Sequence, residues 1–115
     1  MSARHQQRIV TDDDVEKALS WLRDSAKQMG HAKARMIRAG HMVKHIEALE
    51  TKMSSERSVE AKKADARCSK RYLDAIEADA LATGAYQELL SRREANAMTI
   101  EAWRSEAANY RAMRI

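Results

Sequence analysis

The chain has 115 residues with no proline, no phenylalanine and only three glycines, and its formal net charge is +4. That length fits one domain, and the abundant Ala, Glu, Lys, Arg, Leu and Met favour helix nearly everywhere. No run of β-branched residues alternates with polar ones, so a sheet is not expected. The single cysteine, Cys68, excludes an internal disulfide bond.

Residues 1–10 are polar and basic up to Ile9, and we predict a frayed tail there. This tail lacks the apolar core of a signal peptide, and no segment approaches the length that spans a membrane. We therefore expect a protein of the cytoplasm that makes no membrane contact.

The clearest local signal lies at the start of the first helix. Thr11 is suited to cap the helix by accepting hydrogen bonds from the free amides of the first turn. Asp14 stands where a capping box would have Glu or Gln, and Val10 and Val15 occupy the positions of a hydrophobic staple. A helix is therefore predicted to begin at residue 11 or 12.

Two apolar series, each repeating every seven residues, predict one long helix over residues 12–53 with a coiled-coil-like seam. Gly30 and Gly40 lie inside this helix, and each disfavours it by about 1 kcal/mol relative to Ala. The helix is therefore either continuous or bent or broken at one of these glycines. The first apolar series is Val15, Leu22, Met29, Met36 and Val43, and the second is Ala18, Ser25, Ala32, Ala39, Ile46 and Met53.

Residues 54–69 form the predicted connector, because small polar side chains cluster at its start. Ser58 is suited to cap a short helix from Val59 to about Arg67, and Cys68 and Ser69 either interrupt that helix or continue it. A second long helix is predicted over residues 70–113, with a kink or change of register at Gly84. Its expected buried face is first Leu73, Ile76 and Ala80, and then Tyr86, Leu89, Ile100, Trp103, Ala107 and Tyr110.

Because connected elements usually lie side by side, the predicted fold is all-α, a long antiparallel, coiled-coil-like helical hairpin in a single domain. Two helices cannot cover their own apolar seam, so we expect a homo-oligomer in which hairpins assemble into a helical bundle. The residues assigned to self-association are Val15, Leu22, Met29, Met36, Val43, Ile100 and Trp103.

Positive charge is concentrated in residues 27–71, which hold twelve Lys and Arg against five Asp and Glu, a net charge of +7. No acidic residue lies between Asp24 and Glu47, and a basic segment of this kind can contact phosphates. Six of its side chains share one side of the first helix through spacings of three or four: Lys27, His31, Arg35, Arg38, His41 and His45. The full set of candidate nucleic-acid-binding residues is Lys27, His31, Lys33, Arg35, Arg38, His41, Lys44, His45, Lys62, Lys63, Arg67, Lys70 and Arg71.

The alternative interpretation of this segment is a solvated helix face. No aromatic residue lies within it, so bases are not expected to stack on it. Contacts with single- or double-stranded DNA would then be electrostatic and mostly independent of sequence. Trp21 lies beside the seam and is either a packing residue or an anchor for a partner protein.

No catalytic, metal or cofactor motif is found. His41 and His45 have the spacing of a helical metal pair, but neither a third ligand nor the zinc-protease Glu accompanies them. Cys68 has no histidine partner that spacing can identify, and there is no glycine-rich phosphate loop. We therefore expect no cofactor, no bound metal and no enzymatic activity.

The run Ile100-Glu101-Ala102-Trp103-Arg104-Ser105 and the preceding Arg92-Arg93-Glu94-Ala95 resemble the ending of small helical proteins encoded by tailed phages and prophages. Such proteins look like products of early gene regions, where genes for single-strand annealing and recombination also lie. The resemblance implies a viral origin, a bacterial host cytoplasm and a setting in DNA metabolism. It supplies no catalytic residue.

The sequence therefore favours a non-enzymatic, phage-type accessory protein that binds nucleic acid electrostatically, in viral DNA recombination or replication. The alternative is a coiled-coil structural or protein-interaction module, either an adaptor or an inhibitor of a host protein, without a nucleic-acid role. The salt dependence of DNA binding separates the two, because only the first requires the release of counterions from phosphates.

Overall fold

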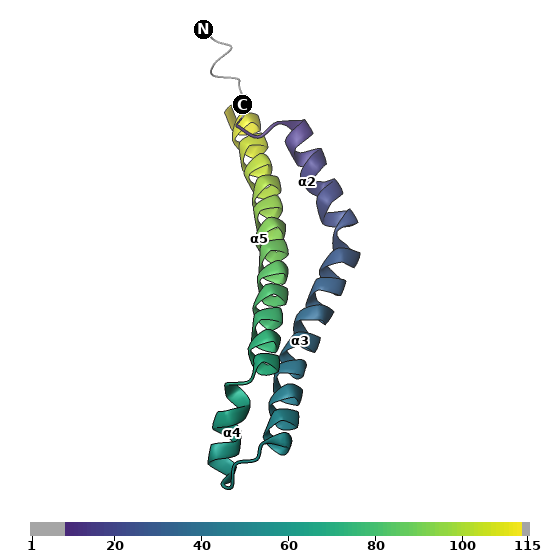
Figure 1. Ribbon diagram of the computed structural model, residues 1–115. Coiled ribbons are helices and arrows are strands. Elements are labelled where there is room, and N and C mark those ends of the chain that lie inside the picture. Colours follow the sequence, from purple (N-terminus) through teal and green to yellow (C-terminus); the bar gives the residue numbers. More distant parts are fainter. Residues whose placement is uncertain (1–8, 114–115) are drawn as a thin grey trace. The chain divides into compact units, whose positions relative to one another are not determined.

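The computed structural model describes residues 9–113, and this part of the chain is helical without strands. The all-α class predicted from composition is confirmed. The helices, labelled in Figure 1, are α2 (Asp12–Asp24), α3 (Ala26–Met53), α4 (Val59–Arg67) and α5 (Lys70–Met113).

The chain divides into two compact units, where the sequence predicted a single domain. Unit 1 comprises residues 1–27 and 89–115, and unit 2 comprises residues 28–88. Within its described residues, unit 1 holds α2 and the C-terminal half of α5. Unit 2 holds nearly all of α3, with α4 and the N-terminal half of α5.

Both units contain an antiparallel pair of helices. In unit 1, Trp103 of α5 hydrogen-bonds to Asp12 at the start of α2, whereas Arg92 lies over Trp21 near the end of α2. In unit 2, Arg71 pairs with Glu50 near the end of α3, and Asp79 faces the earlier Gly40. Residue numbers thus rise along one helix as they fall along its neighbour, which confirms the predicted helical hairpin.

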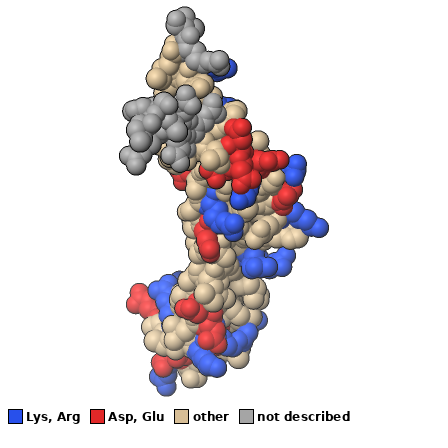
Figure 2. Space-filling view, turned by 90° about the horizontal axis from the view of Figure 1, so that it is seen from above, with Lys and Arg blue, Asp and Glu red and all other residues tan. Residues whose placement is uncertain are grey.

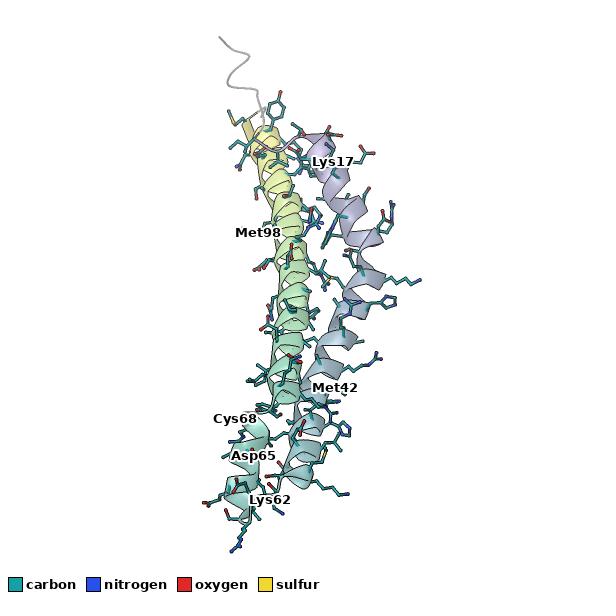
Figure 3. The ribbon with its side chains drawn as sticks, viewed as in Figure 1. Lys17, Met42, Lys62, Asp65, Cys68 and Met98 are labelled. Atoms are coloured by element: carbon teal, nitrogen blue, oxygen red, sulfur yellow. The ribbon has the colours of Figure 1, made fainter. Side chains whose placement is uncertain are left out.

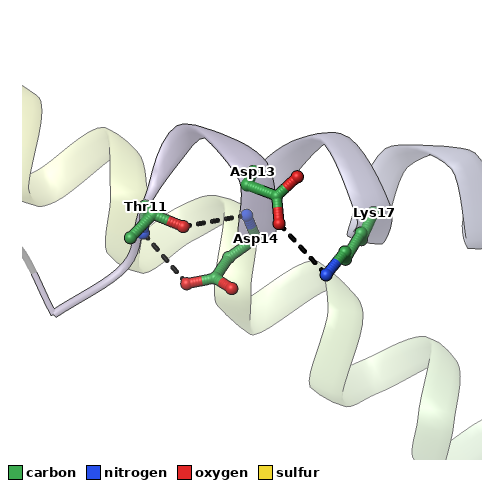
Figure 4. A network of polar contacts seen from close by, with 4 residues as sticks. All are labelled: Thr11, Asp13, Asp14 and Lys17. Carbon is green, nitrogen blue, oxygen red and sulfur yellow. Dashed lines mark hydrogen bonds and ion pairs between the residues drawn. The ribbon is translucent and has the colours of Figure 1, made fainter.

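The start of α2 forms the predicted cap. The Thr11 hydroxyl accepts a hydrogen bond from the Asp14 amide at 3.1 Å, and the Asp14 carboxylate accepts one from the Thr11 amide at 3.0 Å (Figure 4). Asp14 therefore closes a complete capping box although the usual residue is Glu or Gln. One turn further, Lys17 pairs with Asp13 at 3.0 Å.

The prediction of one helix over residues 12–53 is wrong at a single position. Ser25 has φ −86° and ψ −5°, far from the α-helical ψ of about −42°, and it separates α2 from α3. The two glycines at which a break was considered, Gly30 and Gly40, lie inside α3 without positive φ. The kink considered at Gly84 does not interrupt α5.

The seam buries its small residues most completely. Ala18 and Ser25 are 2% and 5% exposed, because small side chains let the partner helix approach closely. From the other apolar series, Val15 is buried, whereas Leu22, Met29, Met36 and Val43 are half-buried. Met53, the last predicted seam residue, is exposed.

The early buried face predicted for α5 is wrong. Leu73, Ile76 and Ala80 are all exposed. Instead, a neighbouring seven-residue repeat of α5 faces α3. The small residues of this repeat, Ala75 and Ala82, permit close packing of the two helices. That inner seam consists of Tyr72, Ala75, Asp79, Ala82, Tyr86 and Leu89, all buried or half-buried.

The later predicted face of α5 is largely correct. Leu89 is buried, and Tyr86, Ile100, Trp103 and Ala107 are half-buried, but Tyr110 is exposed. In the connector, the Ser58 hydroxyl caps α4 by accepting from the Ala61 amide at 3.0 Å. The Ser69 hydroxyl accepts a hydrogen bond from the Tyr72 amide at 3.1 Å and so caps the start of α5. Of the two alternatives for Cys68 and Ser69, the structure has the interruption, and α4 and α5 are separate helices.

Candidate nucleic-acid interface

One side of α3 in unit 2 carries a line of cationic and titratable side chains, the α3 stripe, which consists of His31, Arg35, Arg38, His41 and His45. All five are exposed. Within the described residues none of them makes an ion pair or hydrogen bond. Figure 3 shows long side chains along the outer edge of α3 pointing away from α5.

The stripe is exposed because of its position around the helix. At 100° per residue, it is centred about 100° from the buried series that contains Ala32, Ala39 and Ile46. The helix-forming Ala, Met and Lys residues between them keep the backbone regular, so the spacings of three and four hold all five side chains on one side.

Three predicted cations of α3 lie apart from the stripe. Lys33 and Lys44 are exposed, but they project from the opposite flank of the helix. Lys27 is exposed in the first turn of α3 and belongs to unit 1. We therefore do not include these three residues in the candidate interface.

Two predicted phosphate-binding arginines are already paired with carboxylates. Arg67 lies 3.3 Å from Glu47, and Arg71 lies 3.7 Å from Glu50. The side chains of Glu47 and Glu50 are only 25% and 15% exposed, so these pairs tie α4 and α5 to the end of α3. The sequence could not indicate this, because the partners are about twenty residues apart on different helices. Of the remaining predicted cations, Lys62 is half-buried, and Lys63 and Lys70 are exposed.

A shallow groove of about 430 Å³ lies between α3 and α5 beside the stripe. Its apolar lining comes from Met42, which Figure 3 labels, together with Ile46 and three alanines. Arg35 and Arg38 of the stripe line this groove together with Arg71, which is paired with Glu50, and Asp74 is the one carboxylate in its lining. The groove thus adjoins the stripe but adds no unpaired cation to it.

The other motifs singled out in the sequence remain isolated. His41 and His45 are exposed, and among residues 9–113 no group of three or more His, Cys, Asp or Glu is arranged to hold a metal ion. Cys68 is an exposed free thiol.

Unit 1 contains two aromatic contacts that sequence reasoning missed. The indole N–H of Trp103 donates to Asp12 Oδ1 at 2.9 Å, and the Arg92 guanidinium lies 5.0 Å from the centre of the Trp21 ring. The two partners of each contact are far apart in the chain, so no local pattern marks them. Trp103 and Trp21 both join α2 to α5, which leaves less of either ring for an external partner.

Charges of both signs are interspersed on the face that Figure 2 displays, rather than gathered into one basic area. The α3 stripe is thus a local feature of one helix and not a property of the whole surface. Among the described helices, none combines the length and the apolar character that crossing a membrane requires.

We compared the chain with protein-family models, with curated proteins and with solved structures, and none of them matches it.

Proposed function

We propose that this protein is a non-enzymatic accessory protein that binds nucleic acid electrostatically through the α3 stripe. The observation that supports the proposal is the set of five exposed, unpaired side chains on one side of α3, among the residues that the structure describes. The resemblance of the C-terminal run to phage proteins supports a setting in viral DNA recombination or replication, in the cytoplasm of a bacterial host.

The dimensions of the stripe suit a phosphate backbone. Neighbouring members are three or four residues apart, which at about 1.5 Å per residue separates them by about 4.5–6 Å along the helix axis. From His31 to His45 the stripe extends roughly 21 Å. One strand of DNA advances about 3.4 Å per nucleotide, so the stripe can follow roughly six phosphates of one strand.

The main test is the salt dependence of DNA binding. Because affinity arises from counterion release, its logarithm should fall linearly with the logarithm of salt concentration, by about 0.7–0.9 per phosphate neutralised. Replacing Arg35 and Arg38 by Ala should reduce this slope by about 1 to 2, since two phosphate contacts are lost. The measurement is fluorescence anisotropy with labelled single- and double-stranded DNA at several salt concentrations.

The matched control is Arg93→Ala/Arg111→Ala, which removes the same charge from exposed positions of α5 in unit 1. It should leave the slope within experimental error of wild type, and circular dichroism should show equal helicity for all three proteins. Absence of binding at low salt, or equal slopes for the stripe variant and the control variant, would reject a nucleic-acid role for the stripe.

The second candidate function is a structural or protein-interaction module, as adaptor or inhibitor. It is favoured by large apolar side chains that α5 leaves exposed in unit 2, among them Leu73 at 54% and Leu81 at 67%. If the salt titration rejects DNA binding, this function takes its place, because an exposed apolar face suits a protein partner better than a phosphate backbone.

A further inference from the structure

Unit 2 has an apolar face on the side opposite the groove. We call it the outer face, and it consists of Ile37 with the flanking Lys33 and Lys44 on α3, and of Leu73, Ile76 and Ala80 on α5. All six residues are exposed, and Ile37, Leu73 and Ile76 are 46%, 54% and 41% exposed. Such a group of large apolar side chains within a small unit marks an interaction surface.

The positions on both helices confirm that these residues share one side. On α5, residues 73, 76 and 80 fall within an arc of about 60°, centred about 120° from the inner seam. The groove-lining Arg71, Asp74 and Ala78 lie at the other flank of that seam. On α3, Ile37 likewise lies on the flank opposite Arg35 and Arg38, so the outer face and the α3 stripe do not overlap.

The spacing of the α5 residues is itself that of a helix-packing seam. Leu73, Ile76 and Ala80 are separated by three and four residues, as in the inner seam that already holds α3. A helix with two adjacent seams is typical of a bundle in which it contacts two neighbours. The outer face therefore fits a helix as its partner.

The charges of unit 2 indicate which helix this is. Residues 28–46 of α3 contain four Lys and Arg and no acidic residue, whereas residues 72–88 of α5 contain four Asp and Glu and no Lys or Arg. In a dimer whose twofold axis runs parallel to the helices, α3 of each copy lies along α5 of the other copy. Each acid-free segment then lies against a base-free one. In the register that the Gly40–Asp79 contact sets, Lys44 lies near the exposed Glu77 of the second copy, and Lys33 lies level with Gln87.

We propose that the outer face binds a second copy of this chain, with α3 of each copy packed antiparallel on α5 of the other in a four-helix bundle. The apolar stem of Lys44 then lies over Ile76 of the second copy, and its ammonium group reaches Glu77. The proposal does not depend on nucleic-acid binding, because the α3 stripe stays on the solvent side of this bundle.

This assignment replaces the self-association surface predicted from sequence. Val15 is buried within the chain, and Leu22, Met29, Met36 and Val43 are half-buried in it. Ile100 and Trp103 are half-buried in unit 1. Most of the surface that sequence reasoning assigned to a second copy is thus already used by the hairpin itself.

The first test is sedimentation equilibrium of the full chain at micromolar concentration, with the variants Ile76→Glu and Leu81→Glu. Wild type should be a dimer, and Ile76→Glu should weaken the dimer by more than about tenfold, because each copy would bury an unpaired carboxylate. Leu81→Glu is the matched control, since Leu81 is an exposed apolar residue of the same helix on the groove side. It should remain a dimer with wild-type affinity.

The second test is an exchange of charges, which remains informative if Ile76→Glu lowers helicity. The variants Lys33→Glu/Lys44→Glu and Glu77→Lys/Gln87→Lys should each dissociate, because like charges then face one another. Mixed in equal amounts, they should form a dimer of one copy of each. A monomeric wild type, a dimer disrupted by Leu81→Glu and not by Ile76→Glu, or charge variants that do not combine would each overturn the proposal.

Discussion

The Thr11–Asp14 cap shows how much one pair of side chains contributes to the start of α2. The backbone amide of Thr11 donates to the Asp14 carboxylate, and this contact, with a smaller one from the Thr11 hydroxyl, holds the pKa of Asp14 below its ordinary value. A lowered pKa means that folding favours the ionised carboxylate. The resulting stabilisation is complete above the ordinary Asp pKa, near 4, and is lost as pH falls through the lowered pKa of the folded state.

Replacing Asp14 by Asn is therefore expected to destabilise the protein at neutral pH but not in strong acid. The difference from wild type should be constant from pH 7 down to the ordinary Asp pKa, near 4, and should disappear as pH falls through the lowered pKa of Asp14 in the folded state. Urea unfolding followed by circular dichroism measures it. The control is Asp13→Asn, which removes the same charge from the same turn but breaks only the pair with Lys17. If Asp13→Asn has the larger effect at pH 7, the cap is not the source of the pH dependence.

At the scale of residues, sequence predicts what is local. The cap was predictable because its two partners are three residues apart and because helix starts have known preferences. The hydrogen bond from Trp103 to Asp12 was not, because it depends on how α2 packs on α5. The pairing of Arg67 and Arg71 with carboxylates of α3 was missed for the same reason.

At the scale of elements, periodicity predicted the helices better than the faces that they bury. The short helix α4 and the long α5 lie where the sequence placed them. In α5, however, two overlapping repeats compete, and the larger side chains of Leu73 and Ile76 suggested the wrong one. The inner seam packs around Ala75 and Ala82 because close approach of two helices requires small side chains, not large ones.

The uninterrupted course of α3 and α5 through their glycines leads to an expectation about stability. Gly30 and Gly84 lie in helix interiors, and a methyl group added at either would meet no atom within 4 Å. Gly30→Ala and Gly84→Ala should therefore each stabilise the protein by about 0.5–1 kcal/mol, because Ala loses less backbone entropy on folding. Thermal unfolding of the single and double variants provides the measurement.

Gly40→Ala is the informative comparison for these two variants. A methyl group at Gly40 would lie 3.9 Å from the Asp79 carboxylate, an ordinary contact that gives no clash but brings an apolar group against a charge. Its stabilisation should be smaller than that of the other two. If Gly30→Ala or Gly84→Ala lowers the melting temperature, the helix is not regular at that position.

At the scale of the whole molecule, charge is distributed along the chain and not between the two units. The segment 27–71 has a net charge of +7 and residues 72–115 a net charge of −2, yet each unit carries a net charge of +2 because unit 2 combines the basic segment with the acidic residues 72–88 of α5. Spacing alone places the residues of the α3 stripe on one side of a single helix. It could not show that this stripe and the apolar outer face lie on different sides of unit 2, because that relation depends on which seam of α5 packs against α3.

The separation of these two surfaces leads to a last prediction, which depends on both proposals. A twofold dimer carries two α3 stripes, so a DNA long enough to reach both should bind more tightly than one stripe allows, by on the order of 100-fold through effective concentration. A short oligonucleotide of roughly six nucleotides can fill only one stripe and should not show this gain.

Ile76→Glu should therefore weaken binding to the long DNA while leaving binding to the short one unchanged. Leu81→Glu should leave both unchanged. Anisotropy titrations at one fixed salt concentration give these affinities. Equal losses on both DNAs would mean that Ile76 acts on the stripe itself and that the two surfaces are not separate.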